Sequence, residues 1–226
     1  MKKIISTTFF LFCAMLLNAQ TVAILGDSYS TYEDYLTPDT NAVWYKKTFD
    51  KKRTDVADVT QTWWWQVVKE GGFKLGQNNS FSGATICYTG YRDEDYKDRS
   101  FVTRLTNLGC PDIIFVFGGT NDSWCGAQVG EYKYEDFRRA DLYFYRPALA
   151  CLFSEMQKRY PNVEIYFILN SELRDDITSS TLTICKHYAI PCIQLHDIDK
   201  MANHPSIKGM RAIADQVLAE LKRLRK

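Results

Sequence analysis

Short hydrophobic runs alternate with longer amphipathic stretches along most of the chain. Runs rich in β-branched and aromatic residues lie at 21–25, 112–117, 163–169 and 192–195, and a weaker run spans 73–81. Runs of this length and composition predict β-strands. The segment 113–117 is apolar at every position, which is typical of a strand buried on both faces of a sheet.

The stretches between these runs have the length and spacing of helices. The last is the clearest, because apolar residues recur at three- and four-residue steps from Ile207 to Leu221, with Pro205 ahead and basic residues at the end. Other expected helices span 60–69, 100–108, 134–159 and 175–187. Pro147 lies inside the third of these and is expected to kink or divide it.

Strands that alternate with helices imply βαβ crossovers. We therefore expect a mainly parallel sheet of five strands with helices on both faces. The sequence contains no internal repeat and no Pro/Ser-rich linker, so residues 20–226 are interpreted as one domain.

Polar segments follow the ends of the expected strands. They are Gly-Asp-Ser at 26–28, Ser-Gly-Ala at 82–84, Gly-Gly-Thr-Asn-Asp at 118–122 and, before the last helix, Asn-His-Pro at 203–205. In a parallel α/β sheet the ligand site lies beyond the carboxyl ends of the strands. All four segments are therefore expected at one edge of the sheet.

These residue types fit an acyl-transfer site. A serine hydroxyl needs a neighbouring base to become a nucleophile, and His204 is the histidine at a strand-to-helix junction of this edge. The oxyanion formed by attack needs fixed N–H donors, which the Ser28 amide, the Gly83 amide and the Asn121 side chain can supply. Taken singly, Gly83 and Asn121 are equally typical of ordinary turns, so the prediction depends on their joint placement.

Composition and charge exclude other functions. The chain has 226 residues, with 28 Lys and Arg against 27 Asp and Glu, which leaves no basic excess for a nucleic-acid backbone. Only three histidines are present, which disfavours a metal site built from histidine. Tyrosines and tryptophans follow both Ser28 and Gly83, and we expect aromatic side chains near the site, where they stack on sugar rings or simply pack.

The first 19 residues have the layout of a signal peptide. Lys2 and Lys3 precede an apolar run from Ile4 to Leu17, and a short polar exit ends at Gln20. We expect residues 1–19 to be cleaved after Ala19 and the protein to be exported to the periplasm or beyond. The alternative is a buried first helix or strand. The run is too short to span a membrane, and no later stretch is long enough.

Seven cysteines are present, of which Cys13 lies in the expected signal peptide. The other six form no CxxC pair, which argues against zinc-ribbon and thioredoxin-like sites. In an exported protein they are candidates for disulfides. Cys185 and Cys192 bracket a short loop, and a bridge between Cys87 and Cys125 would brace the expected site from outside. The alternative is that several are buried free thiols.

Together the four polar segments at 26–28, 82–84, 118–122 and 203–205 resemble the motifs of the SGNH hydrolases, also called the GDSL esterase/lipase superfamily. Ser28, Gly83, Asn121 and His204 match the four residues of that name, in order, along the whole of residues 20–226. The resemblance implies a three-layer α/β/α, flavodoxin-like fold and hydrolysis of esters through an acyl-serine, with no metal and no other cofactor. Exported bacterial members often deacetylate polysaccharides, and the segment Thr62–Trp65 is similar to theirs. We therefore expect a secreted O-acetylesterase acting on acetylated carbohydrate.

One position departs from the family pattern. The family usually has an aspartate three residues before the histidine to orient it, and here that residue is Met201. Asp199 is the nearest candidate replacement, reached through a longer turn. Otherwise a backbone carbonyl or a water orients His204 in a Ser-His dyad, which we slightly prefer.

Two other functions remain open. One is a lysophospholipase or thioesterase that acts on longer acyl chains, and the other is a carbohydrate-binding module that has lost catalysis. The α/β-hydrolase elbow Gly-x-Ser-x-Gly does not fit, because Ser30 stands where that motif needs its second glycine.

Overall fold

The computed structural model describes residues 19–225, so the expected signal peptide lies outside the described residues except for Ala19. Five parallel strands form one sheet in the order β2-β1-β3-β4-β5. They are β1 (Thr21–Gly26), β2 (Lys74–Ser80), β3 (Ile113–Gly118), β4 (Glu164–Leu169) and β5 (Cys192–Gln194). Each lies within two residues of its expected bounds, and the parallel α/β architecture is confirmed.

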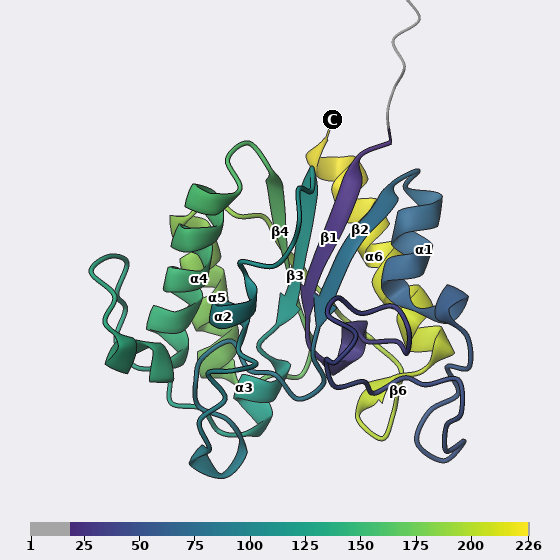
Figure 1. The fold of residues 1–226 in the computed structure, drawn as a ribbon, viewed down its shortest axis with the longest axis horizontal. Helices are drawn as coiled ribbons and strands as arrows, with labels where there is room; N and C mark the ends of the chain where they lie inside the picture. The colour runs from purple at the N-terminus through teal and green to yellow at the C-terminus, as the bar shows by residue number, and fades with distance from the viewer. Residues whose placement is uncertain (1–18, 226) are drawn as a thin grey trace, which may run out of the picture.

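Helices cover both faces of this sheet (Figure 1). Helices α1 (Trp63–Glu70) and α6 (Ile207–Leu224) pack together on one face, and α2 (Phe101–Arg104), α4 (Tyr145–Arg159) and α5 (Asp175–His187) lie on the other. Short elements gather where the strands end: α3 (Thr120–Trp124), the 3₁₀ turn η1 (Ser28–Ser30), and the strands β6 (Lys200–Met201) and β7 (His204–Pro205). The remaining 3₁₀ turns are η2 (Val59–Gln61), η3 (Tyr91–Asp93) and η4 (Arg139–Tyr143).

Three expected helices differ from the structure. The segment 60–69 contains the end of η2 and then α1, which begins at Trp63. The segment 134–159 is divided, as Pro147 indicates, into η4 and α4. Pro147 is the third residue of α4, where a backbone N–H has no partner within the helix, so the proline removes no helical hydrogen bond. Helix α2 ends at Arg104 rather than at residue 108.

The sheet separates two hydrophobic cores. Along β3, Ile114 and Val116 pack toward α4 and α5, whereas Ile113, Phe115 and Phe117 pack toward α1 and α6. Strand side chains alternate between faces, so an entirely apolar strand fills both cores at once. This explains why residues 113–117 carry no polar position.

The candidate bridge between Cys87 and Cys125 is not present. All six cysteines within residues 19–225 are free thiols. The Cys87 thiol points to the Thr89 carbonyl at 3.5 Å, and the Cys125 thiol points to the Asp122 carbonyl at 3.7 Å. These two side chains are therefore satisfied locally, in line with the alternative of free thiols.

None of the helices in the described part of the chain is both long and apolar enough to cross a bilayer.

Replacement of Phe117 tests how far the fold depends on the central strand. Phe117 is fully buried and packs edge-on against Tyr29 and Trp63, each at 5.7 Å between ring centroids. We expect Phe117→Ala to lower the free energy of unfolding by about 3–5 kcal/mol, measured by urea denaturation. The control Leu224→Ala, at the exposed end of α6, is expected to cost less than about 1 kcal/mol. Equal losses in both variants would contradict this role of Phe117.

Candidate active site

Three adjacent strands bring three of the expected residues to one edge of the sheet. Gly26, the last residue of β1, pairs with Ser80 of β2 and with Phe117 of β3, so the three strands end at the same level. Ser28, Gly83 and Asn121 each follow within three residues of their strand's end. The register of the sheet, rather than any loop, therefore places these residues together.

Ser28 lies on a tight turn that buried charges support. Asp27 caps η1, with its Oδ1 accepting the Tyr29 N–H at 3.0 Å. Burial raises the pKa of Asp27 to about 7, although the backbone hydrogen bond and Arg104 oppose that shift. The Arg104 guanidinium is also buried and donates to the Gly26 carbonyl at 3.1 Å. The turn is thus fixed from within the core.

A tight hairpin carries His204. Strands β6 and β7 are antiparallel and pair Met201 with His204, and the two turn residues Ala202 and Asn203 have φ of 45° and 62°. Two consecutive positive φ values at the centre of a two-residue hairpin are typical of a type I′ turn. The turn directs the His204 ring toward Ser28, and the distance from Nε2 to Ser28 Oγ is 3.0 Å.

A backbone carbonyl orients the imidazole. His204 Nδ1 lies 2.9 Å from the carbonyl oxygen of Ala202, in the turn of the same hairpin. Because a carbonyl only accepts, Nδ1 carries the proton, and Nε2 presents its lone pair to Ser28.

The structure does not bring Asp199 to the histidine. Its carboxylate accepts the hydroxyl of Ser206, which in turn caps α6 by accepting the Gly209 N–H at 3.1 Å. Asp199 is held in this role because its own carbonyl also accepts the Ser206 N–H, at 3.1 Å. The contacts of His204 are thus with Ser28 and the Ala202 carbonyl, and the Ser-His dyad stays the interpretation that we prefer.

Two tyrosine hydroxyls hold the hairpin on both sides of His204. Tyr29 donates to the Asn203 carbonyl at 2.6 Å, and Tyr45 donates to the Pro205 carbonyl at 2.9 Å. Both tyrosines are buried, and Tyr29 is the residue after Ser28. The nucleophile turn and the hairpin are therefore tied together directly.

Aromatic rings enclose the imidazole. The Trp44 indole stacks on it with 3.5 Å between ring centroids and 6° between planes, and Trp124 approaches at 5.8 Å. Ser28 is 2% exposed and His204 is 6% exposed, so little water reaches the pair. Burial, with a smaller contribution from Arg53, lowers the pKa of His204 to about 4, although the hydrogen bond to Ala202 opposes the shift.

The two remaining donors lie on well-defined segments. Gly83 has φ of +84°, a conformation that favours glycine, and among residues 19–225 its N–H has no acceptor within hydrogen-bond distance. The Asn121 amide donates to the Ala84 carbonyl at 2.9 Å, and its Oδ1 accepts the Tyr91 hydroxyl at 2.8 Å. These two contacts decide which way the amide faces, and its second N–H has no acceptor among residues 19–225.

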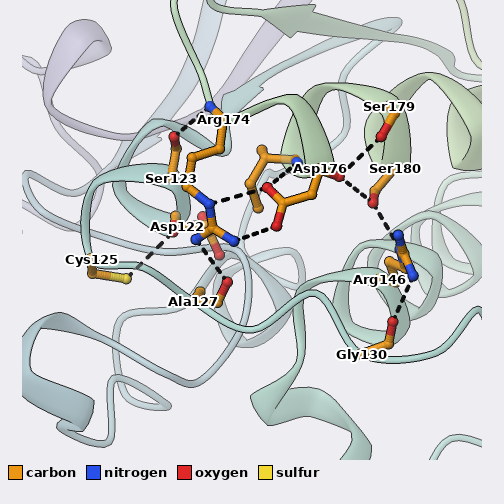
Figure 2. Close-up of polar contacts among 11 residues, drawn as sticks. Asp122, Ser123, Cys125, Ala127, Gly130, Arg146, Arg174, Asp176, Ser179 and Ser180 are labelled. Carbon is orange, nitrogen blue, oxygen red and sulfur yellow. Dashed lines mark hydrogen bonds and ion pairs between the residues drawn. The ribbon is translucent and has the colours of Figure 1, made fainter.

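Helix α3, which carries Asn121, is anchored from two directions. The buried Asp122 carboxylate accepts the N–H groups of Ile86 and Cys87, at 2.9 Å and 3.1 Å, which ties α3 to the segment after Gly83. Figure 2 shows the second anchor, in which Arg174 at the start of α5 donates to Ser123 Oγ at 2.9 Å. The Arg174 guanidinium also pairs with Asp176 and contacts the Ala127 carbonyl. The donor side chain is thus held on a braced helix.

Sequence reasoning did not identify the specific roles of Trp44, Tyr91 or the Ala202 carbonyl. For Trp44 and Tyr91, the only indication in the sequence was that aromatic residues follow Ser28 and Gly83. Nothing in the sequence singles out Ala202, because every residue has a carbonyl and Ala-Asn is not among the preferred type I′ pairs.

Within residues 19–225, no group of three or more His, Cys, Asp or Glu side chains is placed to hold a metal ion.

The chain is similar to one family over nearly all of its described residues. A family model described as GDSL-like Lipase/Acylhydrolase matches residues 20–221. A protein from Bacteroides ovatus that bears the name GDSL-like lipase is 55% identical, with a TM-score of 0.90, over 91% of this chain and 99% of its own. One of the same name from Bacteroides uniformis is 50% identical, with a TM-score of 0.89, over 92% and 97%. An acetyl xylan esterase from the rumen bacterium Butyrivibrio proteoclasticus shares the fold at 14% identity, with a TM-score of 0.59, over 90% and 64%. No match is found among curated proteins.

A titration of the histidines tests the electrostatics of this site. We expect the His204 ring to protonate near pH 4, because burial disfavours its charged form. NMR of the ring protons as a function of pH measures the midpoint of this protonation. A His204 titration at the ordinary value would show that the ring is hydrated.

Proposed function

This chain belongs to the GDSL-like lipase/acylhydrolase family and is an ester hydrolase, and we propose that it uses Ser28 and His204 to remove acetyl groups from carbohydrate. The contact that carries the catalytic part of the proposal is the 3.0 Å distance between His204 Nε2 and Ser28 Oγ. The Ala202 carbonyl supports it by holding the imidazole in the tautomer that accepts a proton.

In the proposed reaction, His204 Nε2 takes the proton of Ser28 as Oγ attacks the carbonyl carbon of the ester. The carbonyl π electrons move to oxygen and form a tetrahedral oxyanion. That oxyanion accepts hydrogen bonds from the amides of Ser28 and Gly83 and from the free N–H of Asn121. Tyr91 matters here because its hydroxyl keeps Asn121 Oδ1 turned away from the negative charge.

Collapse of the intermediate breaks the ester C–O bond, and the imidazolium gives its proton to the departing alcohol. Water then attacks the acyl-serine, with His204 again as base, and releases the carboxylic acid and free Ser28. Within residues 19–225, no carboxylate contacts the His204 ring to stabilise the imidazolium. His204 therefore remains neutral and competent as a base well below neutral pH.

The surroundings support a small acyl group and a hydrophilic alcohol. Trp44 and Trp124 enclose the imidazole closely. The cavity on the far side of Trp44 is lined by five charged or hydroxylated side chains and three apolar ones. Such a lining suits a sugar better than a long acyl chain.

We also propose that the protein acts outside the cytoplasm. The pattern of Lys2, Lys3 and the apolar run that follows supports export to the periplasm or beyond. A polysaccharide substrate would be met there.

Acetate release from acetylated polysaccharides tests the proposed activity. We expect the wild-type protein to release acetate and Ser28→Ala to lose at least about 10³-fold in kcat, because no nucleophile remains. Esters of increasing acyl length run in parallel, and faster turnover of long chains than of acetyl would favour a lysophospholipase or thioesterase. If a fluorophosphonate does not label Ser28 in folded protein, the non-catalytic carbohydrate-binding module is the remaining hypothesis.

A second variant separates the dyad from a triad. We expect Asp199→Asn to change kcat by less than tenfold, because Asp199 contacts Ser206 rather than His204. Loss of an orienting acid would instead cost about 10⁴-fold. The matched control is Asp197→Asn, an exposed aspartate of the same segment. Thermal denaturation of both variants distinguishes a weakened α6 cap from a catalytic effect.

A further inference from the structure

A cavity of about 280 Å³ adjoins the candidate active site. Its lining comes entirely from one segment after the nucleophile: Val43, Trp44, Lys46, Thr48, Phe49, Asp50, Arg53 and Thr54. Trp44 belongs to both places, since its indole also stacks on the His204 imidazole at 3.5 Å. A molecule bound in the cavity therefore lies one aromatic ring away from the reacting pair.

Arg53 lies against the cavity face of Trp44. Its guanidinium carbon is 4.3 Å from the centre of the indole, and the imidazole already occupies the opposite face. Across residues 19–225, no carboxylate lies within 4.0 Å of the Arg53 guanidinium. The contact with the ring positions the guanidinium, and its N–H donors form no hydrogen bond with other groups of residues 19–225.

The segment around the cavity is strongly basic in a chain that is nearly neutral. Residues 46–53 read Lys-Lys-Thr-Phe-Asp-Lys-Lys-Arg, with five basic residues and one acid, whereas the whole chain has a formal charge of +1. The basic residues of this segment that line the cavity are Lys46 and Arg53, and Lys47 is already paired with Asp34. Asp50 is the opposing charge, and its Oδ1 accepts the Lys52 N–H at 2.9 Å.

We propose that this cavity binds a carboxylate on the alcohol portion of the ester, so that the preferred substrate is an acetylated glycan containing uronic acid. The proposal rests on the proposed esterase function. A planar guanidinium with free donors matches a carboxylate through two parallel hydrogen bonds, and Lys46 adds a second positive charge. The volume is at the lower end of ligand pockets, about 300 Å³, which suits one sugar unit rather than an acyl chain.

The position of Arg53 relates this binding to the reaction. The carboxylate would be held on one side of Trp44 while the acetyl group reaches Ser28 on the other. Binding energy from a non-reacting part of the substrate would thereby position the ester. Arg53 is thus a specificity-determining residue, and it takes part in no proton transfer.

A matched pair of substrates tests the proposal. One is an O-acetylated galacturonic acid oligomer, and the other is the same oligomer after reduction of its carboxylates to neutral alcohols. For wild-type protein we expect kcat/KM to be about tenfold or more higher on the acidic oligomer, mainly through KM. The ratio is expected to fall as salt is raised, because the contact is partly exposed to solvent.

Three variants identify the residues responsible. Arg53→Gln is expected to bring the acidic-to-neutral ratio of kcat/KM close to one. Asp50→Asn is expected to increase this ratio, because the substitution removes the negative charge that opposes the substrate carboxylate. The control Lys51→Gln removes one positive charge from the same segment but not from the cavity lining, and its ratio is expected to stay near that of wild type. An equal effect of Lys51→Gln and Arg53→Gln on this ratio would show only non-specific electrostatic attraction of the acidic oligomer and would overturn the carboxylate site.

The rates of acetate release from the two oligomers distinguish failure of the carboxylate site from failure of the esterase function. Equal rates on both oligomers, with no change in Arg53→Gln, would overturn the carboxylate site and leave the esterase intact. If neither oligomer releases acetate, the esterase proposal fails for this class of substrate. Calorimetry with the unacetylated acidic oligomer then tests whether the cavity binds a carboxylate. Binding that weakens about tenfold in Arg53→Gln supports the carboxylate site, and an absence of binding to the wild-type protein overturns it.

Discussion

The candidate active site depends on two tyrosine hydrogen bonds that tie the beginning of the domain to its end. Ser28 and His204 are 176 residues apart, and their 3.0 Å contact requires the first strand's turn and the last hairpin to meet in one orientation. Tyr29 and Tyr45 enforce that meeting by donating to the carbonyls on both sides of His204. Both hydroxyls are buried, where an unmade hydrogen bond is costly, so the hairpin has little freedom to turn the ring away.

The absence of an acid at position 201 changes how the histidine is held rather than whether it is held. Met201 and His204 pair across a type I′ hairpin, and the turn offers the Ala202 carbonyl to Nδ1 at 2.9 Å. A carbonyl fixes the tautomer as well as a carboxylate does, but it brings no full negative charge to stabilise the imidazolium. Burial, to which the stacked Trp44 ring contributes, outweighs that hydrogen bond and lowers the pKa of His204 to about 4.

Buried polar groups make the surrounding donors rigid. Asp27 and Arg104 hold the turn of Ser28 from beneath, and Asp122 links α3 to the loop that begins at Gly83. Both carboxylates have raised pKa values because they are buried, near 7 for Asp27 and near 6 for Asp122. Stabilisation of an oxyanion requires donors that are fixed before the charge forms, and this network gives that rigidity to the proposed donors.

Sequence patterns alone predicted the parallel sheet, its five strands, and the four residues Ser28, Gly83, Asn121 and His204 that the fold brings to one edge of the sheet. The periodicity of apolar residues and the order of strands and helices are local properties, so they can be recognised in the amino-acid sequence without the fold. Only the tertiary structure decided what orients His204, that Asp199 instead supports a helix cap, that Cys87 and Cys125 are unbridged, and that Arg53 stacks beside the site. Each of these is a contact between side chains or carbonyls brought close by folding, and neither spacing along the chain nor residue type specifies which partner a group meets.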